Sequence, residues 1–141
     1  MRFVVDTNRI IASLVRDSAS RKILLSEKFE FLTVGVARSE IEEHRKELLE
    51  KAKLTDKQLD TILAMLFKRI FVVSDVVIEK KMRQAKKIMD TIDPSDTPFI
   101  AVALAMENDG IWSDDKHFSK QKRIKIWKTK DLLRLIKRGL V

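Results

Sequence analysis

The chain has 141 residues, of which 45% are hydrophobic and 35% charged, with a formal net charge of +8 at pH 7. These values fit one folded domain over residues 1–141 and exclude a disordered chain. The positive charge favours an anionic partner such as nucleic acid, but a densely charged, well-solvated surface explains the composition equally well. The absence of cysteine excludes disulfides, thiolate zinc sites and cysteine nucleophiles, and two histidines are too few for a histidine-based metal cluster.

The first elements follow a strand-and-helix pattern. Residues 3–5 form a short apolar strand that ends at Asp6, and apolar residues then recur at helical spacing over 10–15. A second short helix carries the apolar residues 23–25. Residues 31–34 form a second strand, which Gly35 closes. The sequence therefore begins as two strands separated by helices.

A polar helical segment over 36–53 comes next. Thr55 and Gln58 have the spacing of a capping box, which predicts the start of another helix whose apolar stripe reaches residue 67. We expect these two helices to form a hairpin.

The second half repeats the pattern. Residues 71–73 form a third strand, and a one-sided apolar face over 78–89 predicts a helix. A helix begins near Asp96, and its body over 99–106 is apolar on nearly every side, so we expect it to be the most buried helix. Gly110 is predicted to end it.

The last elements are two short strands and a helix. The strands are predicted at 111–113 and 124–127, and the helix at 132–136. Strands separated by helices favour right-handed crossovers and a parallel sheet covered on both faces. The sequence predicts a three-layer α/β/α sandwich with a central parallel sheet of about five strands.

Acidic residues stand where the predicted strands and helices meet. In an open parallel sheet, ligands bind beyond the carboxyl ends of the strands. Asp6 follows the first strand, Asp114 and Asp115 follow the fourth, Asp96 starts the buried helix, and Glu40 lies early in the helix after the second strand. All of them could open onto one rim of the sheet.

Each acid also has an ordinary structural explanation as a helix cap, a turn residue or a solvated helix residue. Asp6 is the hardest to explain in this way, since it follows an apolar strand and no cation is near it before Arg9. Several carboxylates that meet repel one another unless a divalent cation lies between them, and Mg²⁺ or Mn²⁺ suits carboxylate oxygens. Such ions can activate water for phosphodiester cleavage.

Four short motifs carry a resemblance to a known family. They are Asp6-Thr7-Asn8, Glu40-Ile41, Asp96 followed by Ala101, Ala103 and Leu104, and residues 112–118. In order and spacing the sequence resembles the PIN domain (PilT N-terminus) family, from residue 3 to the last helix. The resemblance implies an α/β/α fold, often dimeric, and Mg²⁺- or Mn²⁺-dependent cleavage of single-stranded or structured RNA that leaves a 5′-phosphate.

The resemblance also implies roles for individual residues. The catalytic, metal-binding carboxylates would be Asp6, Glu40, Asp96 and Asp115. Polar support that orients Asp6 and the metal water would come from Thr7, Asn8 and Ser113. Two further acids, Asp93 and Asp114, lie near the site, and either could bind metal through water. Asp114 is also an alternative to Asp115 as the fourth metal-binding carboxylate.

Basic residues offer contacts to a phosphate backbone. The candidates are Arg38 on the polar helix and Lys116, Lys120, Lys122 and Arg123 after the acidic pair. Lysines on a solvated edge strand, which discourage pairing with another sheet, explain the second group equally well. We assign neither His44 nor His117 to the site, and we expect Trp112 and Trp127 to belong to the core.

The sequence thus predicts a metal-dependent ribonuclease. It does not separate a VapC-like toxin, with an antitoxin protein as partner, from a housekeeping enzyme, and the resemblance favours a homodimer. One alternative is an inactive PIN module that only binds RNA or protein. Another is a haloacid-dehalogenase-like phosphatase, which requires an aspartate where this chain has Asn8. With short apolar groups and no secretory signal, we expect a cytoplasmic protein outside the membrane.

Overall fold

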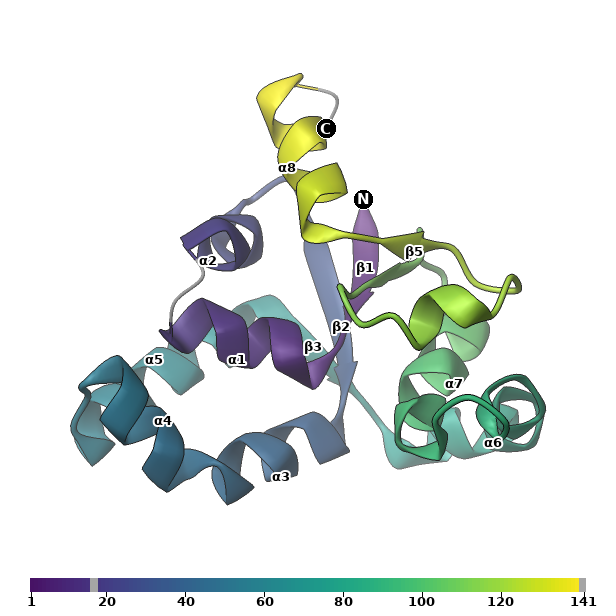
Figure 1. Cartoon of the computed structure of the whole chain (residues 1–141), viewed down its shortest axis with the longest axis horizontal. Coiled ribbons are helices and arrows are strands. Elements are labelled where there is room, and N and C mark those ends of the chain that lie inside the picture. The colour runs from purple at the N-terminus through teal and green to yellow at the C-terminus, as the bar shows by residue number, and fades with distance from the viewer. Residues whose placement is uncertain (16–17, 140–141) are drawn as a thin grey trace.

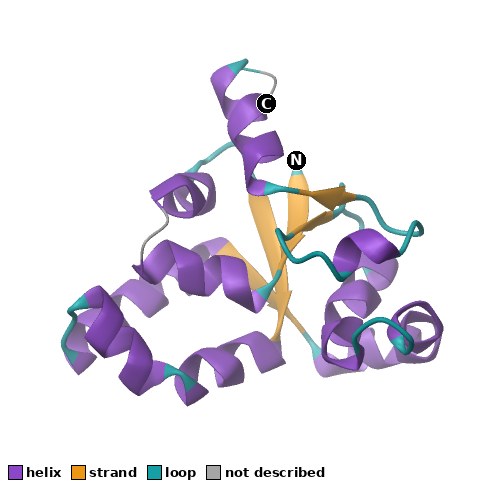
Figure 2. Ribbon diagram, viewed as in Figure 1, coloured by secondary structure: helices purple, strands orange, loops and turns teal. Residues whose placement is uncertain are grey.

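The computed structural model describes residues 1–15 and 18–139. Its centre is a five-stranded sheet in the order β3-β2-β1-β4-β5, in which every neighbouring pair is parallel (Figure 2). The strands are β1 (Arg2–Val5), β2 (Glu30–Val34), β3 (Ile70–Val73), β4 (Ile111–Trp112) and β5 (Ile126–Trp127). The sequence-based strands are confirmed, although β4 and β5 are shorter than predicted.

Helices cover both faces of this sheet (Figure 1). The α-helices are α1 (Thr7–Val15), α2 (Ser18–Leu25), α3 (Gly35–Glu43), α4 (Arg45–Ala52), α5 (Asp56–Arg69), α6 (Asp75–Met89), α7 (Thr97–Ala105) and α8 (Thr129–Lys137). Two short 3-10 helices, η1 (Pro94–Asp96) and η2 (Phe118–Lys120), complete the described elements.

The apolar core is divided by the sheet into two layers. Along β1, Phe3 and Val5 face the cluster formed with α1, α2, α4, α5 and α8, whereas Val4 faces the cluster formed with α6 and α7. Successive side chains of a strand point to opposite faces, so the buried residues Phe3–Val5 of one strand contribute to both layers. The three-layer α/β/α architecture is confirmed.

The polar segment predicted as one helix over 36–53 is two helices. His44 leaves helical geometry, with φ −96° and ψ 9°, and separates α3 from α4. The change of direction lets Leu48 join the core on the α1 side of the sheet. Arg45 then forms ion pairs with Glu42 of α3 and with Asp56 and Asp60 of α5. The capping box at the start of α5 is confirmed, with Gln58 N–H donating to Thr55 Oγ1 at 3.2 Å.

The most buried helix is α7, as predicted. Six of its residues are buried, and its end is at Ala105, so Gly110 does not terminate it. Gly110 instead has φ +132°, and a Cβ atom there would overlap the carbonyl oxygen of Lys125 and lie 2.9 Å from the Trp127 ring. The missing side chain therefore allows β5 to lie close to the start of β4. Among the described residues, no helix has the combination of length and hydrophobicity that spanning a bilayer requires.

Candidate metal centre

The four acids expected to hold metal meet in one cavity. It has a volume of about 170 Å³ and lies beyond the carboxyl ends of β1 and β4, next to the starts of α1 and α7 and beside Glu40 in the second half of α3. Nine residues line it: Asp6, Thr7, Asn8, Glu40, Asp93, Ser95, Asp96, Phe99 and Asp115. No lysine or arginine is among these described lining residues, although the charge of Arg9 acts on Asp6 from outside the lining.

Asp6 is held by hydrogen bonds on both carboxylate oxygens. It is 5% exposed, and its Oδ1 accepts from the backbone N–H of Arg9 at 3.0 Å, which makes Asp6 the cap of α1. The hydroxyl of Ser113 donates to its Oδ2. Burial raises the pKa of Asp6 to about 6, and these two hydrogen bonds keep the rise from being larger. Asp6 is thus rigidly oriented, and of the charged groups near it Arg9 lowers its pKa whereas Asp115 raises it.

Asp96 has one carboxylate oxygen without a partner. Its side chain does not cap α7, contrary to the simple interpretation from sequence, and its Oδ2 is shielded from solvent without a hydrogen bond. Burial, and to a smaller extent the negative charges of Asp93, Asp115 and Asp6, together raise the pKa of Asp96 to about 7. A cation in the cavity would relieve both effects.

Ser113 connects Asp6 with Asp115. Its buried hydroxyl donates to Asp6 and accepts from the backbone N–H of Asp115 at 3.0 Å. Asp115 in turn accepts from the backbone N–H of His117 at 2.8 Å through Oδ1. The turn after β4 therefore fixes a second carboxylate near Asp6, and the predicted contact between Ser113 and Asp6 is present.

The other supporting residues differ in their contacts. Thr7 lines the cavity and is 4% exposed, yet its Oγ1 has no hydrogen-bond partner in the described chain and does not reach Asp6. Asn8 lines the cavity from an exposed position. Asp93 accepts from the backbone N–H and hydroxyl of Ser95 at 3.0 and 2.7 Å, and these bonds hold its pKa below the usual range.

Asp114 is not with the cavity acids. Its Oδ2 forms an ion pair with Arg9 at 2.9 Å, and its two oxygens accept from the N–H and hydroxyl of Thr129 at 2.9 and 2.6 Å. Asp114 and Asp115 are consecutive residues in a turn, and their side chains bind different parts of the molecule. We therefore remove Asp114 from the predicted set of metal ligands and keep Asp115.

His117 lies beside the cavity acids, although we did not assign it from sequence. Its Nδ1 is 3.1 Å from Oδ2 of Asp93 and 3.3 Å from Oδ1 of Asp115. With Asp93 and Asp96 it forms a group whose ligand atoms all lie within 4.8 Å of one another. The available signal was its spacing of two residues from Asp115 within one turn, which returns it to the same side.

The cavity residues fit a divalent cation. Carboxylate oxygens predominate, and hard ions such as Mg²⁺ and Mn²⁺ bind such oxygens. Asp96 Oδ2 and Thr7 Oγ1 are buried polar atoms without partners, and buried polar atoms normally have one. An ion or its bound water would supply the missing contacts.

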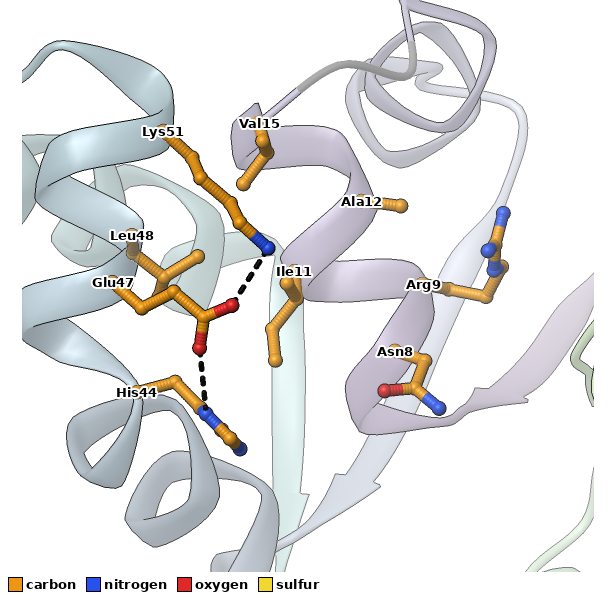
Figure 3. A pocket seen from close by; sticks show the side chains of 9 residues that line it. All are labelled: Asn8, Arg9, Ile11, Ala12, Val15, His44, Glu47, Leu48 and Lys51. Carbon is orange, nitrogen blue, oxygen red and sulfur yellow. Dashed lines mark ion pairs between the residues drawn. The ribbon is translucent and has the colours of Figure 1, made fainter.

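A larger groove lies next to the cavity, between α1 and α4 (Figure 3). Its volume is about 460 Å³, and Asn8 lines both the groove and the cavity. Glu47 forms ion pairs with Lys51 at 2.6 Å and with His44 at 3.5 Å along one side. Apolar side chains supply much of the remaining lining: Ile11, Ala12, Val15 and Leu48.

The predicted phosphate-binding cations are on the surface. Lys116, Lys120, Lys122 and Arg123 are exposed and have no ion pair with any described acid. Arg38 is also exposed, but its guanidinium stacks 4.6 Å from the ring centre of Phe67, away from the acidic cavity.

Comparisons with known proteins give one clear result. A family model described as PIN domain matches residues 4–136, nearly the whole chain. The matched range includes all four acids that line the cavity. No curated protein matches the sequence.

Proposed function

The chain belongs to the PIN-domain family, whose members are generally nucleases, and from this membership we propose that it hydrolyses RNA with the help of Mg²⁺ or Mn²⁺. The observation that carries the proposal is the meeting of Asp6, Glu40, Asp96 and Asp115 in one cavity without a lysine or arginine in its described lining. These carboxylates come from four separate segments of the chain. Their convergence has a cost in charge repulsion that a bound cation would offset.

Four carboxylates would hold the ion: Asp6, Glu40, Asp96 and Asp115. When bound there, Mg²⁺ or Mn²⁺ supplies polarisation of a phosphodiester and a water of lowered pKa. Asp6 is fixed for this task by Ser113 and by the Arg9 N–H, so little side-chain freedom is lost on binding. Asp96 has a free, shielded oxygen that can ligate an ion or accept a proton.

RNA is the proposed substrate because the family resemblance and the net charge of +8 both favour it. The exposed cations Lys116, Lys120, Lys122 and Arg123 follow Asp115 directly in sequence and would attract the phosphate backbone without regard to base sequence. A PIN module that binds RNA without cleaving it remains the rival hypothesis.

A cleavage assay tests the proposal. Purified protein is incubated with mixed RNA and Mn²⁺, with and without chelator, beside Asp6→Asn and the matched control Asp114→Asn. We expect chelator-sensitive cleavage by the wild type and by Asp114→Asn, and none by Asp6→Asn, because only Asp6 lines the cavity. Cleavage that survives chelator or Asp6→Asn contradicts the mechanism. Metal-dependent RNA binding without cleavage supports the inactive module.

We further propose that the protein acts as a VapC-like toxin with an antitoxin partner, and that it forms a homodimer in the cytoplasm. Induced expression of the wild type should then arrest growth, whereas Asp6→Asn should not. Light scattering of the purified protein should give twice the chain mass of 16.4 kDa. Unimpaired growth or a monomeric mass would contradict the respective proposal.

A further inference from the structure

His117 has a ring nitrogen in an unusual position. Nδ1 is shielded from solvent and lies 3.1 Å from Asp93 Oδ2 and 3.3 Å from Asp115 Oδ1, but it makes no well-aligned hydrogen bond. Asp93 already accepts two hydrogen bonds from Ser95 on its other oxygen. The oxygen that faces His117 is therefore the one left for another partner.

Two further atoms nearby also lack partners. Asp96 Oδ2 is shielded and makes no hydrogen bond, and Asp96 belongs with Asp93 and His117 to the group whose ligand atoms lie within 4.8 Å. Thr7, 4% exposed and lining the cavity that Asp93 and Asp96 also line, has an unpartnered Oγ1. Buried polar atoms without partners are rare, and two in the cavity lining, with His117 Nδ1 beside the acids of that lining, point to a missing ligand.

We propose that His117 Nδ1, Asp93 and Asp96 bind a second divalent cation, beside the ion held by Asp6, Glu40, Asp96 and Asp115, and that the nitrogen makes this position selective for a transition-metal ion such as Mn²⁺ over Mg²⁺. Asp96 contributes to both positions. The inference extends the proposed function and rests on it for the first ion.

The selectivity follows from ligand chemistry. Mg²⁺ binds oxygen almost exclusively and gives up its water reluctantly, whereas imidazole nitrogen is a good ligand for first-row transition ions. Ligands on opposite sides of an ion at about 2.1 Å lie roughly 4.2 Å apart, so the group needs only a small contraction. A neutral imidazole is required, since a protonated nitrogen cannot bind metal.

The competing interpretation is an imidazolium that forms ion pairs with Asp93 and Asp115. It uses the same two distances and needs no metal. The two interpretations differ in how strongly the His117 nitrogen couples to a bound Mn²⁺ ion, because a nitrogen bonded to the ion couples to it much more strongly than one that only pairs with its carboxylate ligands.

The test is pulsed electron paramagnetic resonance of the untagged protein loaded with Mn²⁺. The chain has two histidines, so His117→Gln and the matched control His44→Gln assign any coordinated imidazole. We expect nitrogen modulation in the wild type and in His44→Gln, and none in His117→Gln. Equilibrium dialysis should show one fewer Mn²⁺ per His117→Gln chain, or affinity at that position weakened roughly 10-fold or more. Excess Mg²⁺ should leave the nitrogen signal in place.

The possible negative results separate a failure of the second cation site from a failure of the proposed function. Mn²⁺ binding without nitrogen modulation overturns this inference and leaves the proposed function intact, whereas no Mn²⁺ binding at all contradicts both. Loss of the signal in His44→Gln also overturns it. If His117→Gln does not fold, as circular dichroism would show, Asp93→Asn replaces it: the same loss of one ion is expected, and unchanged stoichiometry and signal contradict the proposal.

Discussion

At the scale of single residues, the two buried carboxyl groups determine how stability depends on pH. Burial raises the pKa of Asp6 to about 6 and that of Asp96 to about 7, from the ordinary value of 3.8. The folded state therefore holds these protons more tightly than the unfolded state does. The stability they contribute is fully present below about pH 4 and is lost as the pH rises through 6 to 7.

We predict that, without divalent ions, Asp6→Asn changes this pH dependence. The free energy of unfolding of the wild type should fall relative to the variant between pH 4 and 7.5, by on the order of 2 kcal/mol. At the higher pH, added Mn²⁺ should restore the free energy of unfolding that the wild type has lost. Urea unfolding across this range measures the difference between the proteins, and a difference that is independent of pH would contradict the assigned pKa.

A second prediction at this scale separates the consecutive acids. Asp115→Asn should weaken Mn²⁺ binding roughly 10-fold or more, because Asp115 lines the cavity. Asp114→Asn should leave binding unchanged and reduce stability by no more than about 1 kcal/mol, since its ion pair with Arg9 is partly exposed. Calorimetric titration with Mn²⁺ checks both. Equal losses of affinity would show that Asp114 also serves the ion.

The positions of the acids were predictable, but their directions were not. Asp6 and Asp115 follow strands, and the ends of parallel strands meet at one edge, so periodicity was enough to bring them together. Asp114 is held outside the cavity by Arg9 and Thr129, which leaves Asp115 to enter it. Arg9 is more than a hundred residues away in sequence and Thr129 about 15, so local sequence does not reveal these contacts. His117 escaped assignment for the same reason, because its contacts depend on the turn and on η1.

At the scale of elements, Gly110 controls the approach of β5 to β4. The Lys125 carbonyl accepts from the Ile111 N–H at 2.9 Å, and its oxygen lies too close to leave room for a Cβ on residue 110. The same strands hold the turn that carries Ser113 and Asp115. A substitution that disrupts the pairing of β4 with β5 should therefore also displace Ser113 and Asp115, and with them the acidic cavity.

We predict that Gly110→Ala lowers the free energy of unfolding by about 3 kcal/mol, through its positive φ and the overlap with Lys125. Gly35→Ala is the matched control: a Cβ there meets nothing within 4 Å, and the change should stabilise the protein by about 0.5 kcal/mol. Chemical denaturation measures both. A tolerated Gly110→Ala would refute the described packing of β4 and β5.

Element prediction worked where periodicity was strong. The strands, the capping box at Thr55 and Gln58, and the buried α7 follow from local sequence. The break at His44 did not, because the segment over 36–53 has helical composition throughout and the bend is set by the packing of Leu48 against the α1 side. Gly110 was predicted to end the helix before it, whereas its role is to leave room for the backbone of Lys125. The sequence did not indicate this role, because the contact with Lys125 is long-range.

At the scale of the whole molecule, the acidic cavity is set in a chain of net charge +8. We predict that RNA binding by Asp6→Asn weakens with salt, and that replacing four cations by serine reduces the slope of log K against log salt by about 3. These cations are Lys116, Lys120, Lys122 and Arg123.

The control replaces four other exposed lysines, which lie on α2, on α5 or before β2: Lys22, Lys28, Lys57 and Lys68. Fluorescence anisotropy with a labelled single-stranded RNA measures both slopes. Equal slopes in the two variants would mean that the cations after Asp115 only solvate the surface, as the edge-strand interpretation holds.

Acids from distant parts of the chain meet in one cavity, and anomalous diffraction from crystals soaked in Mn²⁺ would show whether a divalent ion binds between them. We expect a manganese peak inside the cavity, within about 2.3 Å of carboxylate oxygens of Asp6 and Asp96. A cavity without manganese at saturating concentration, or one in which a lysine or arginine side chain neutralises these two acids, would contradict it.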